Sequence, residues 1–390
     1  MISFEEAYDL VLSSHFACGT ERIQLQDALR RVLAEEVLSD TDMPPFNKSA
    51  VDGYACRRSD LGRELECMET IPAGVVPKFS IHPGQCSKIM TGSIVPEGAD
   101  MVMMVEDIEV TTHGKIRFVR EKSSGNICFR AEDLHRGDVV LRPGSLIRPQ
   151  EIAVMASVGY VHPVVYRQPR VGIVTTGDEL VEPGQLPALS QIRNSNASQL
   201  LAQLNAMGIR GTYFGIARDD REALKKILQD AKDASDIVLL TGGVSMGEYD
   251  HVPDVLLDLN FNLIFKSIAI QPGRPTVFGM ADGRYVFGLP GNPVSSFVIF
   301  ELLVKPLLYK SMGHAYPSPE FQMTMGETYS RRRSDRKSLL PVMIREGKVF
   351  LLDYHGSAHI HSYIHADGIM ALEIGTTRIK EGEVVHVRQI

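Results

Sequence analysis

The stretch RVGIVTTGDEL, residues 170–180, decides the fold, because an apolar run ends there in a turn that contains glycine and two acidic residues. Two later apolar runs end in the same way, DIVLLTGGVSMGEYD at residues 236–250 and YVFGLPGNPVSS at residues 285–296. Ligands of an open parallel sheet bind at the carboxyl ends of its strands, so we expect the three turns to converge on one crevice. Glycine lets backbone N–H groups come close to a phosphate, and a helix N-terminus adds a favourable dipole. The turns therefore predict a crevice for an anionic, phosphorylated ligand.

Strands alternate with helices around these turns, over residues 169–315. The expected elements, in chain order, are strand 171–177, helix 196–207, strand 211–217, helix 221–232, strand 236–243, a helix after Asp250, strand 263–269, strand 285–291 and helix 294–309. Such alternation predicts a right-handed, mostly parallel, three-layer α/β domain.

The parts that flank this domain are dominated by short β-rich segments and turns. Residues 1–45 and 146–168 are predicted to form an N-terminal helical and linking domain, with helices expected around 4–11, over 28–37 and over 152–158. Residues 46–145 carry turn signals at regular spacing, which is typical of a compact β domain. Residues 316–390 predict a small C-terminal β domain, a barrel or a sandwich, of which we favour the barrel. The fold class is therefore α/β plus β, in a chain of several domains.

Bulk properties agree with a soluble multi-domain protein. A length of 390 residues is too great for one typical domain, so two to four domains are expected. The net charge of −7 argues against a nucleic-acid partner, because non-specific binding relies on a basic surface. An oxyanion ligand must then be held by local N–H groups and a few placed cations.

Cysteine usage and the N-terminus indicate the compartment. The five cysteines are odd in number and lack CxxC spacing, so they predict free thiols of a reducing compartment. The N-terminal stretch MISFEEAYDLVL is acidic and amphipathic, which does not resemble a signal peptide. The most apolar stretch, residues 294–304, is short and contains Glu301, so no membrane span is expected. We predict a cytoplasmic protein without membrane partners.

The first two turns carry acidic side chains with two open interpretations. Glu179 and Asp250 are hard oxygen ligands that suit Mg²⁺ bound together with a substrate phosphate, and Asp219 lies at another strand end. The alternative is structural, since acidic residues at these places also cap helices. In the second turn, Gly242 and Gly243 allow close approach of the backbone to a phosphate, and the hydroxyl of Ser245 can bind a phosphate oxygen.

The third turn and the segment before it predict anion recognition. Pro290 and Pro293 fix the backbone where a long helix starts, and Ser295 offers an N–H and a hydroxyl there. Arg274 sits in a stiff Pro-Gly-Arg-Pro turn that suits recognition of an oxyanion, although surface arginine is the commoner role. Lys266 is a second candidate cation.

Taken together, the motifs resemble the MoeA family, which is similar to the E domain of gephyrin. The match covers nearly the whole chain. The motifs that carry it, in chain order, are MPPFNKSAVDGYA (43–55), IMTGSIVPEGAD (89–100), GDEL (177–180), TGGVSMGEYD (241–250), PGRPTVFG (272–279) and GLPGNPVSS (288–296). The resemblance implies a molybdopterin molybdenumtransferase with a central MogA-like domain. Such an enzyme inserts molybdate into adenylylated molybdopterin, releases AMP and requires Mg²⁺.

The resemblance also implies partners and residue roles. Members of the family are homodimers that receive adenylylated molybdopterin from a molybdopterin adenylyltransferase. Asp52 and Thr91 are implied to enter the cleft of the partner subunit. The acidic set around Mg²⁺ and the pyrophosphate is implied to be Glu179, Asp219 and Asp250, with Glu179 and Asp250 as metal ligands. The residues near the pterin phosphate or the molybdate are implied to be Lys266, Arg274, Ser295 and Ser357, and Asp133 matches the aspartate of a family Gly-Glu-Asp motif.

Three departures from the family pattern concern oxyanion binding. Gln271 stands where a lysine is common, Arg274 replaces the lysine of PGKP, and Pro341 replaces an arginine of the C-terminal domain, while Arg336 matches another. These departures leave a tungstate-preferring homologue as one alternative. A scaffold protein of the gephyrin E type is a second, and an adenylyltransferase of the MogA type is a third that the additional β domains disfavour.

Overall fold

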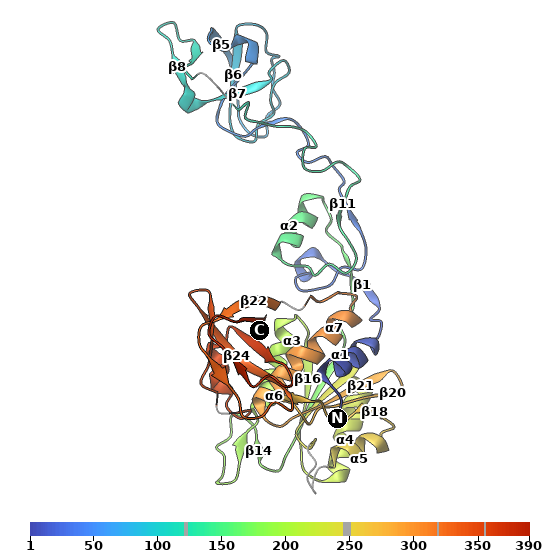
Figure 1. The fold of residues 1–390 in the computed structure, drawn as a ribbon. Coiled ribbons are helices and arrows are strands. Elements are labelled where there is room, and N and C mark those ends of the chain that lie inside the picture. Colours follow the sequence, from blue (N-terminus) through green and yellow to red (C-terminus); the bar gives the residue numbers. More distant parts are fainter. Residues whose placement is uncertain (121–123, 245–250, 318–319, 355) are drawn as a thin grey trace. The chain divides into compact units, whose positions relative to one another are not determined.

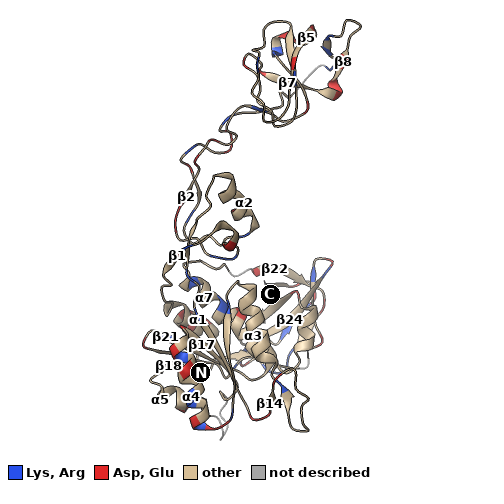
Figure 2. Ribbon diagram, turned by 180° about the vertical axis from the view of Figure 1, so that it is seen from behind, with Lys and Arg blue, Asp and Glu red and all other residues tan. Residues whose placement is uncertain are grey.

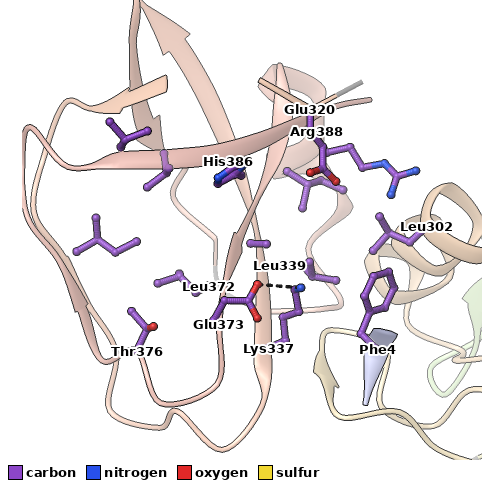
Figure 3. A pocket seen from close by; sticks show the side chains of 15 residues that line it. Phe4, Leu302, Glu320, Lys337, Leu339, Leu372, Glu373, Thr376, His386 and Arg388 are labelled. Carbon is purple, nitrogen blue, oxygen red and sulfur yellow. Dashed lines mark ion pairs between the residues drawn. The ribbon is translucent and has the colours of Figure 1, made fainter. Parts of the chain in front are cut away.

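The computed structural model describes residues 1–120, 124–244, 251–317, 320–354 and 356–390. Contacts divide the chain into two compact units (Figure 1). The large unit consists of Met1–Ala34, Pro143–Arg148 and Pro163–Ile390, and the small unit consists of Glu35–Arg142 and Pro149–His162. Figure 2 shows that basic and acidic residues are interspersed along both units, as the modest net charge suggests.

A six-stranded mixed sheet forms the centre of the α/β domain in the large unit. Its strands, in spatial order, are β16 (Gly211–Ala217), β13 (Val171–Thr176), β17 (Ile237–Thr241), β21 (Arg284–Leu289), β20 (Val277–Ala281) and β18 (Asn262–Phe265). The first four are parallel, whereas β20 and β18 pair antiparallel. The mostly parallel α/β domain is thus confirmed. The expected strand over 263–269 is shorter, and β20 is an additional strand.

Helices cover both faces of this sheet. One face packs against α3 (Ser195–Ala206), α6 (Pro293–Ile299) and α7 (Lys305–Ser311), and the other packs against α4 (Arg221–Ala234) and α5 (Val252–Asp258). Successive residues of a strand point to opposite faces, so Ile173 lies in the first core and Val174 in the second. A π-helical segment, η4 (Phe300–Val304), joins α6 to α7. This is the expected three-layer arrangement.

The C-terminal segment forms a closed five-stranded barrel. Its strands pair in a ring, with β24 hydrogen-bonded to both β25 and β26. The strands are β22 (Glu320–Met325), β24 (Lys337–Arg345), β25 (Lys348–Leu351), β26 (Gly368–Leu372) and β28 (Val384–Gln389). A short strand of the α/β domain, β19 (Ile270–Gln271), adds to this barrel by pairing parallel with β24. The predicted C-terminal barrel is confirmed, and it shares a sheet with the α/β domain.

The N-terminal segment of the large unit contains one α-helix, α1 (Phe4–Ser13). The expected helix over 28–37 is wrong. The element directly before this stretch is a 3₁₀ turn, η1 (Leu25–Asp27). Within the stretch, Val32 and Leu33 form isolated bridges to Leu146 and Val165. Both side chains are fully buried, so the apolar pattern reflects extended chain held in a core.

The small unit is built around a six-stranded sheet. Its strands, in spatial order, are β7 (Met101–Met104), β4 (Gly53–Cys56), β6 (Gln85–Ile89), β5 (Glu64–Ile71), β9 (Ile116–Phe118) and β8 (Ile108–Val110). One face of the sheet encloses a core that includes Leu65, Met101 and Phe118. The same unit contains α2 (Pro149–Ser157). The β-rich character expected for this part of the chain is observed.

Short elements complete the described chain. In the large unit they are β1 (Thr20–Arg22), β12 (Val164–Tyr166), β14 (Leu180–Val181), β15 (Ile192–Arg193), β23 (Tyr329–Ser330), η5 (Ile360–His365) and β27 (Arg378–Ile379). In the small unit they are β2 (Val37–Leu38), β3 (Lys48–Ser49), η2 (Arg58–Asp60), η3 (Val105–Asp107), β10 (Ile127–Cys128) and β11 (Val139–Leu141). None of the helices formed by the described residues combines the length and the apolar composition of a transmembrane span.

Candidate active site

The three glycine-containing turns converge on one cavity of about 740 Å³, here called the turn cavity. It lies at the carboxyl ends of the parallel strands β13, β17 and β21, where an open sheet binds its ligands. The predicted crevice is therefore present. The residues that line it are Thr176, Gly177, Glu179, Leu180, Ile192, Arg193, Asn194, Ser195, Asn196, Asp219, Thr241, Gly242, Gly243, Val244, Pro275, Pro290, Gly291, Asn292, Pro293, Ala358, Ile360 and His361.

Two acidic residues, Glu179 and Asp219, line one side of the turn cavity. Asp219 accepts a hydrogen bond from the hydroxyl of Thr176 (3.0 Å), and one from the N–H of Asp178 (3.3 Å). The carboxylate of Asp178 in turn accepts from the N–H of Asp219 (3.2 Å). This reciprocal pair holds the ends of β13 and β16 together. The cap of α4 is the neighbouring Asp220, which accepts from the N–H of Ala223, so Asp219 is not needed for capping.

Glu179 folds back over its own turn. Its carboxylate lies where a side chain at Gly177 would begin, and Gly177 adopts a φ of 146°, so glycine is required there. The side chain of Glu179 is exposed. Glu179 and Asp219 thus present hard oxygen donors, and Mg²⁺ is commonly held by one or two carboxylates together with substrate phosphates. The donor chemistry of this corner fits Mg²⁺.

Ser245 and Asp250 lie outside the described residues, together with the rest of 245–250. Within the described ranges, no group of three or more His, Cys, Asp or Glu side chains is arranged to hold a metal ion.

The glycines of the second turn serve packing. A side chain at Gly242 would overlap with the carbonyl oxygen of Thr176, and Gly242 and Gly243 have φ values of 91° and 61°. The N–H of Gly242 donates to the carbonyl of Leu289 (3.2 Å). Gly242 lines the cavity as expected, but its N–H is already engaged by the neighbouring strand. Because it has no side chain, Gly242 allows its own turn to pack closely against the turn that follows Thr176.

Asn196 is a polar residue that the sequence reasoning missed. Its side-chain N–H₂ group donates to the carbonyl of Gly291 (2.8 Å) and lies 3.4 Å from the hydroxyl of Thr241. Its oxygen Oδ1 is buried and has no hydrogen-bond partner among the described residues, and the residue is only 7% exposed. Buried oxygens are rarely left without a donor. Because Asn196 lines the turn cavity, a ligand N–H or O–H can satisfy it.

A second cavity of about 410 Å³, here called the cationic cavity, adjoins the first. The two share Val244, Pro275, Pro290 and Asn292 in their walls. Three cationic side chains line it, Lys266, Arg274 and Arg336. Its other lining residues are Ser267, Ile270, Gln271, Pro272, Gly273, Ser295, Tyr354, Gly356 and Ser357. The described residues that line this pocket include three cations and no carboxylate, a charge balance that favours an anion.

The loop that carries Arg274 is fixed from several sides. Gly273 has a φ of 111°, and its carbonyl accepts a hydrogen bond from the hydroxyl of Thr276 (2.6 Å). The carbonyl of Arg274 accepts from the N–H of Ile268 (3.0 Å). The loop also contains β19, which pairs with the barrel strand β24. The stiff turn expected from the sequence is present, and the barrel contributes to its position.

The start of α6 forms the wall between the cavities. Pro290 lines both, Pro293 lines the turn cavity, and the buried Ser295 lines the cationic cavity. Ser357, from the barrel, accepts a hydrogen bond from the amide of Asn292 (2.8 Å), and its carbonyl accepts from the N–H of Val294 (3.1 Å). The barrel loop is therefore attached to the beginning of this helix.

Two of the family departures have different surroundings. Gln271 is exposed and lines the cationic cavity, so its neutral amide stands among the cations. Pro341 is buried in β24 opposite Ile369, and it lines neither cavity. Pro341 itself therefore contributes nothing to the described walls of either cavity.

Three expected site residues belong to the small unit, whereas both cavities belong to the large unit. The carboxylate of Asp52 accepts hydrogen bonds from the N–H (2.7 Å) and the hydroxyl (2.8 Å) of Thr91. These two bonds, with a smaller contribution from Lys88, lower the pKa of Asp52, so it stays ionised at neutral pH. Asp133 is exposed, and its N–H donates to the carbonyl of Met43 (3.0 Å).

Three family models match consecutive parts of the chain. Residues 2–159 match the MoeA N-terminal region (domain I and II), residues 172–310 match a probable molybdopterin binding domain, and residues 328–390 match the MoeA C-terminal region (domain IV). Fold and matches together define a multi-domain enzyme of molybdenum cofactor biosynthesis.

Individual relatives agree over the full length. The chain is 33% identical to a molybdopterin molybdenumtransferase of Staphylococcus epidermidis, over 99% of this chain and 95% of that protein. A molybdopterin molybdenumtransferase of Staphylococcus aureus is 30% identical, with the same coverage. The crystal structure of the MoeA protein from Pyrococcus horikoshii OT3 superposes with a TM-score of 0.84 at 30% identity, over 100% of both chains. The chain belongs to the MoeA family, and its enzyme class is that of the molybdopterin molybdenumtransferases.

Proposed function

We propose that the chain inserts molybdate into adenylylated molybdopterin, with release of AMP and with a requirement for Mg²⁺. The observation that carries this proposal is the pair of adjoining cavities in the large unit. One contains glycine turns and carboxylates, and the other contains three cations. The turn cavity suits a phosphoanhydride with its metal ion, and the cationic cavity suits a tetrahedral oxyanion.

In the turn cavity, Glu179 and Asp219 would hold Mg²⁺ against the phosphoanhydride. When bound, the metal ion neutralises the phosphate charge and polarises the bond that is cleaved. Asn196 would accept a hydrogen bond from a donor of the bound substrate through its buried Oδ1. The hydrogen bonds around Asp219 fix its carboxylate before the ligand arrives, which reduces the ordering required on binding.

In the cationic cavity, Lys266, Arg274 and Arg336 would bind the molybdate oxygens. Ser295 and Ser357 line the same cavity, and their hydroxyls are hydrogen-bond donors. Cations that are placed before reaction stabilise an oxyanion without later rearrangement. The shared wall then brings the oxyanion next to the substrate in the turn cavity. Positioning and charge neutralisation therefore supply the catalysis, and no covalent enzyme intermediate is needed.

The proposal includes the assembly. The active form would be a homodimer in which Asp52 and Thr91 of one subunit complete the cleft of the other, with Asp133 contributing to substrate binding. The substrate would arrive from a molybdopterin adenylyltransferase. The reaction would take place in the cytoplasm, in keeping with five cysteines that are all free thiols.

Replacing the acidic side chains tests the metal site. We expect Asp219→Asn and Glu179→Gln each to lower molybdate-dependent AMP release by about 100-fold, because each removes a charge that neutralises or holds Mg²⁺. Asp220→Asn is the matched control. Asp220 is the adjacent carboxylate, and asparagine caps a helix as well as aspartate, so turnover should not change. Full AMP release by both site variants at limiting Mg²⁺ would remove these residues from the proposed metal site.

A mixing experiment tests the shared cleft. Asp52→Ala and Glu179→Ala should each be inactive alone. Random mixing of subunits makes half of the dimers mixed, and one of the two clefts in each mixed dimer is intact. Activity should therefore return to about a quarter of the wild-type rate. Asp138→Asn is the control for the small unit, because Asp138 also accepts a backbone hydrogen bond and is also exposed. Failure to regain activity, with exchange of subunits demonstrated, would contradict a cleft made by two chains.

Gln271 favours one alternative, a tungstate-preferring enzyme, because it places a neutral amide where a cation is common and it lines the cationic cavity. Competition between molybdate and tungstate in the same AMP-release assay distinguishes the molybdate-inserting enzyme from the tungstate-preferring one. A strong preference for molybdate excludes the tungstate-preferring enzyme. A scaffold of the gephyrin E type would show no AMP release under any of these conditions.

A further inference from the structure

Three of the five cysteines lie side by side in the sheet of the small unit. Cys86 on β6 is the register partner of Cys56 on β4, and also of Cys67 on β5. Cys56 and Cys86 are completely buried, whereas Cys67 is exposed. An exposed thiol therefore has a buried thiol as its direct neighbour on the next strand.

The two neighbouring thiols interact. The side chain of Cys86 donates a hydrogen bond to Cys67, and this bond is the main reason that the pKa of Cys67 falls to about 6. The positive charge of Lys88 and backbone hydrogen bonds at Lys88 and Glu69 act in the same direction. The pKa of Cys86 is raised by the same bond and by burial. The pair therefore favours the thiolate form of Cys67 and the protonated form of Cys86.

The other cysteines have the opposite character. Burial raises the pKa of Cys56 to about 12 and that of Cys18 to about 11. Burial and the carboxylate of Glu132 raise the pKa of Cys128. The thiolate is the reactive form of cysteine, so Cys67 should differ sharply from the other four thiols in reactivity.

The backbone geometry allows a bond between the pair. Neighbouring strands are separated by about 4.8 Å, which lies within the range of Cα separations that a disulfide spans. Cys67 and Leu65 are two residues apart and share a sheet face, and Leu65 and Cys86 lie in the same core. Register partners on adjacent strands have their side chains on the same side of the sheet, so the two thiols face the same way.

We propose that Cys67 and Cys86 form a peroxide-sensitive thiol pair, a modification site that is independent of the proposed transferase reaction. The Cys67 thiolate attacks one oxygen of hydrogen peroxide, the O–O bond breaks, and the leaving hydroxide takes up a proton to form water. The sulfur of Cys86 then attacks the sulfenic acid of Cys67, and the S–O bond breaks as the S–S bond forms. The hydroxyl leaves as a second water with the Cys86 proton. One peroxide is thus reduced as two thiols are oxidised.

Two expected site residues, Asp52 and Thr91, lie next to the sheet that contains the thiol pair. Cys86 lies on β6, whose last residue, Ile89, is the register partner of Gly53 on β4. Asp52 and Thr91 lie just beyond these two residues and hydrogen-bond each other. One of the two strands that carry the thiol pair, β6, therefore ends beside the Asp52–Thr91 pair.

Alkylation of the full-length reduced protein tests the reactivity of Cys67. With iodoacetamide and peptide mapping, Cys67 should be the first residue modified at pH 7, and its rate should reach half its maximum near pH 6. The titratable groups that neighbour it in the sheet are Lys88, Tyr54, Cys56 and Cys86, and Cys86→Ala should move the midpoint upward by removing the hydrogen bond. Equal rates at Cys67 and Cys128 would overturn the proposal.

Treatment with hydrogen peroxide tests the bond itself. The mapped peptides of Cys67 and Cys86 should become linked in the wild-type protein, and a thiol reductant should separate them. Cys86→Ala should instead accumulate a sulfenic acid at Cys67 that a diketone reagent traps. Cys67→Ser should give neither product, and Cys128→Ser should behave as wild type. Thermal unfolding of each variant shows that it is folded. A folded wild-type protein that forms no linked peptide, or one in which Cys67 stops at the sulfenic acid, overturns the pair.

Discussion

Replacing Arg274 by alanine is expected to lower the kcat/KM for molybdate by about 100-fold, which corresponds to about 2.7 kcal/mol of lost binding in the transition state. Arg274 lies in a loop fixed by two prolines, by the Thr276–Gly273 hydrogen bond and by the pairing of β19 with the barrel. A cation fixed in this way binds an oxyanion without first losing conformational freedom. Steady-state AMP release at varied molybdate concentration measures the effect.

Two further variants make this result specific. Arg274→Lys keeps the charge but loses the bidentate geometry of the guanidinium, so we expect a loss of about 10-fold. Arg332→Ala removes an exposed arginine that lines neither cavity, and it should leave kcat/KM unchanged. An unchanged KM for molybdate in Arg274→Ala would show that the oxyanion binds elsewhere. The cationic cavity would then lose its proposed role.

Replacing Gly53 by alanine is expected to destabilise the small unit by about 3 kcal/mol. A methyl group at this position would overlap with the carbonyl oxygen of Met103 on the neighbouring strand β7. Gly53 pairs with Met104 on one side and with Ile89 on the other, so the strand cannot move away without breaking a ladder of hydrogen bonds. The midpoint of thermal unfolding of this unit should fall by about 10 °C. Amide hydrogen exchange should accelerate in β4, β6 and β7.

Gly74→Ala is the control for backbone strain. Gly74 has a φ of 82°, but no atom lies within 4 Å of the position that a side chain would take. This change should therefore cost only about 1 kcal/mol, the ordinary penalty of a left-handed conformation. If both glycine variants lose the same stability, the contact with Met103 is not what makes Gly53 necessary. The unit should then tolerate alanine after a small shift of β7.

Strong local patterns made much of the α/β domain predictable. The strands β13 and β17 are buried along their whole length, and apolar runs of this kind that end in glycine turns are typical of a parallel sheet. The convergence of the three turns was predictable because the carboxyl ends of parallel strands lie at the same edge of a sheet. The stretch 28–37 was misread because buried extended chain can show the same apolar spacing as a helix over a few residues.

Features that depend on distant partners could not be predicted. The free oxygen of Asn196 becomes visible only when Gly291 and Thr241 are seen to engage the amide nitrogen. The N–H of Gly242 is engaged by Leu289 through the packing of two strands that are far apart in the chain. The addition of β19 to the barrel joins residues that are more than 60 positions apart. Local sequence patterns do not indicate contacts between residues that are far apart in the chain.

The wall between the two cavities has a consequence for inhibitor design. Val244, Pro275, Pro290 and Asn292 line both cavities. Under the proposed function, a fragment that mimics a tetrahedral oxyanion and a fragment that mimics a nucleotide would bind on opposite sides of this shared wall. When a short linker joins two such fragments, each holds the other at an effective concentration in the millimolar range. Two weak fragments can thereby become one tight ligand, with selectivity drawn from both compartments.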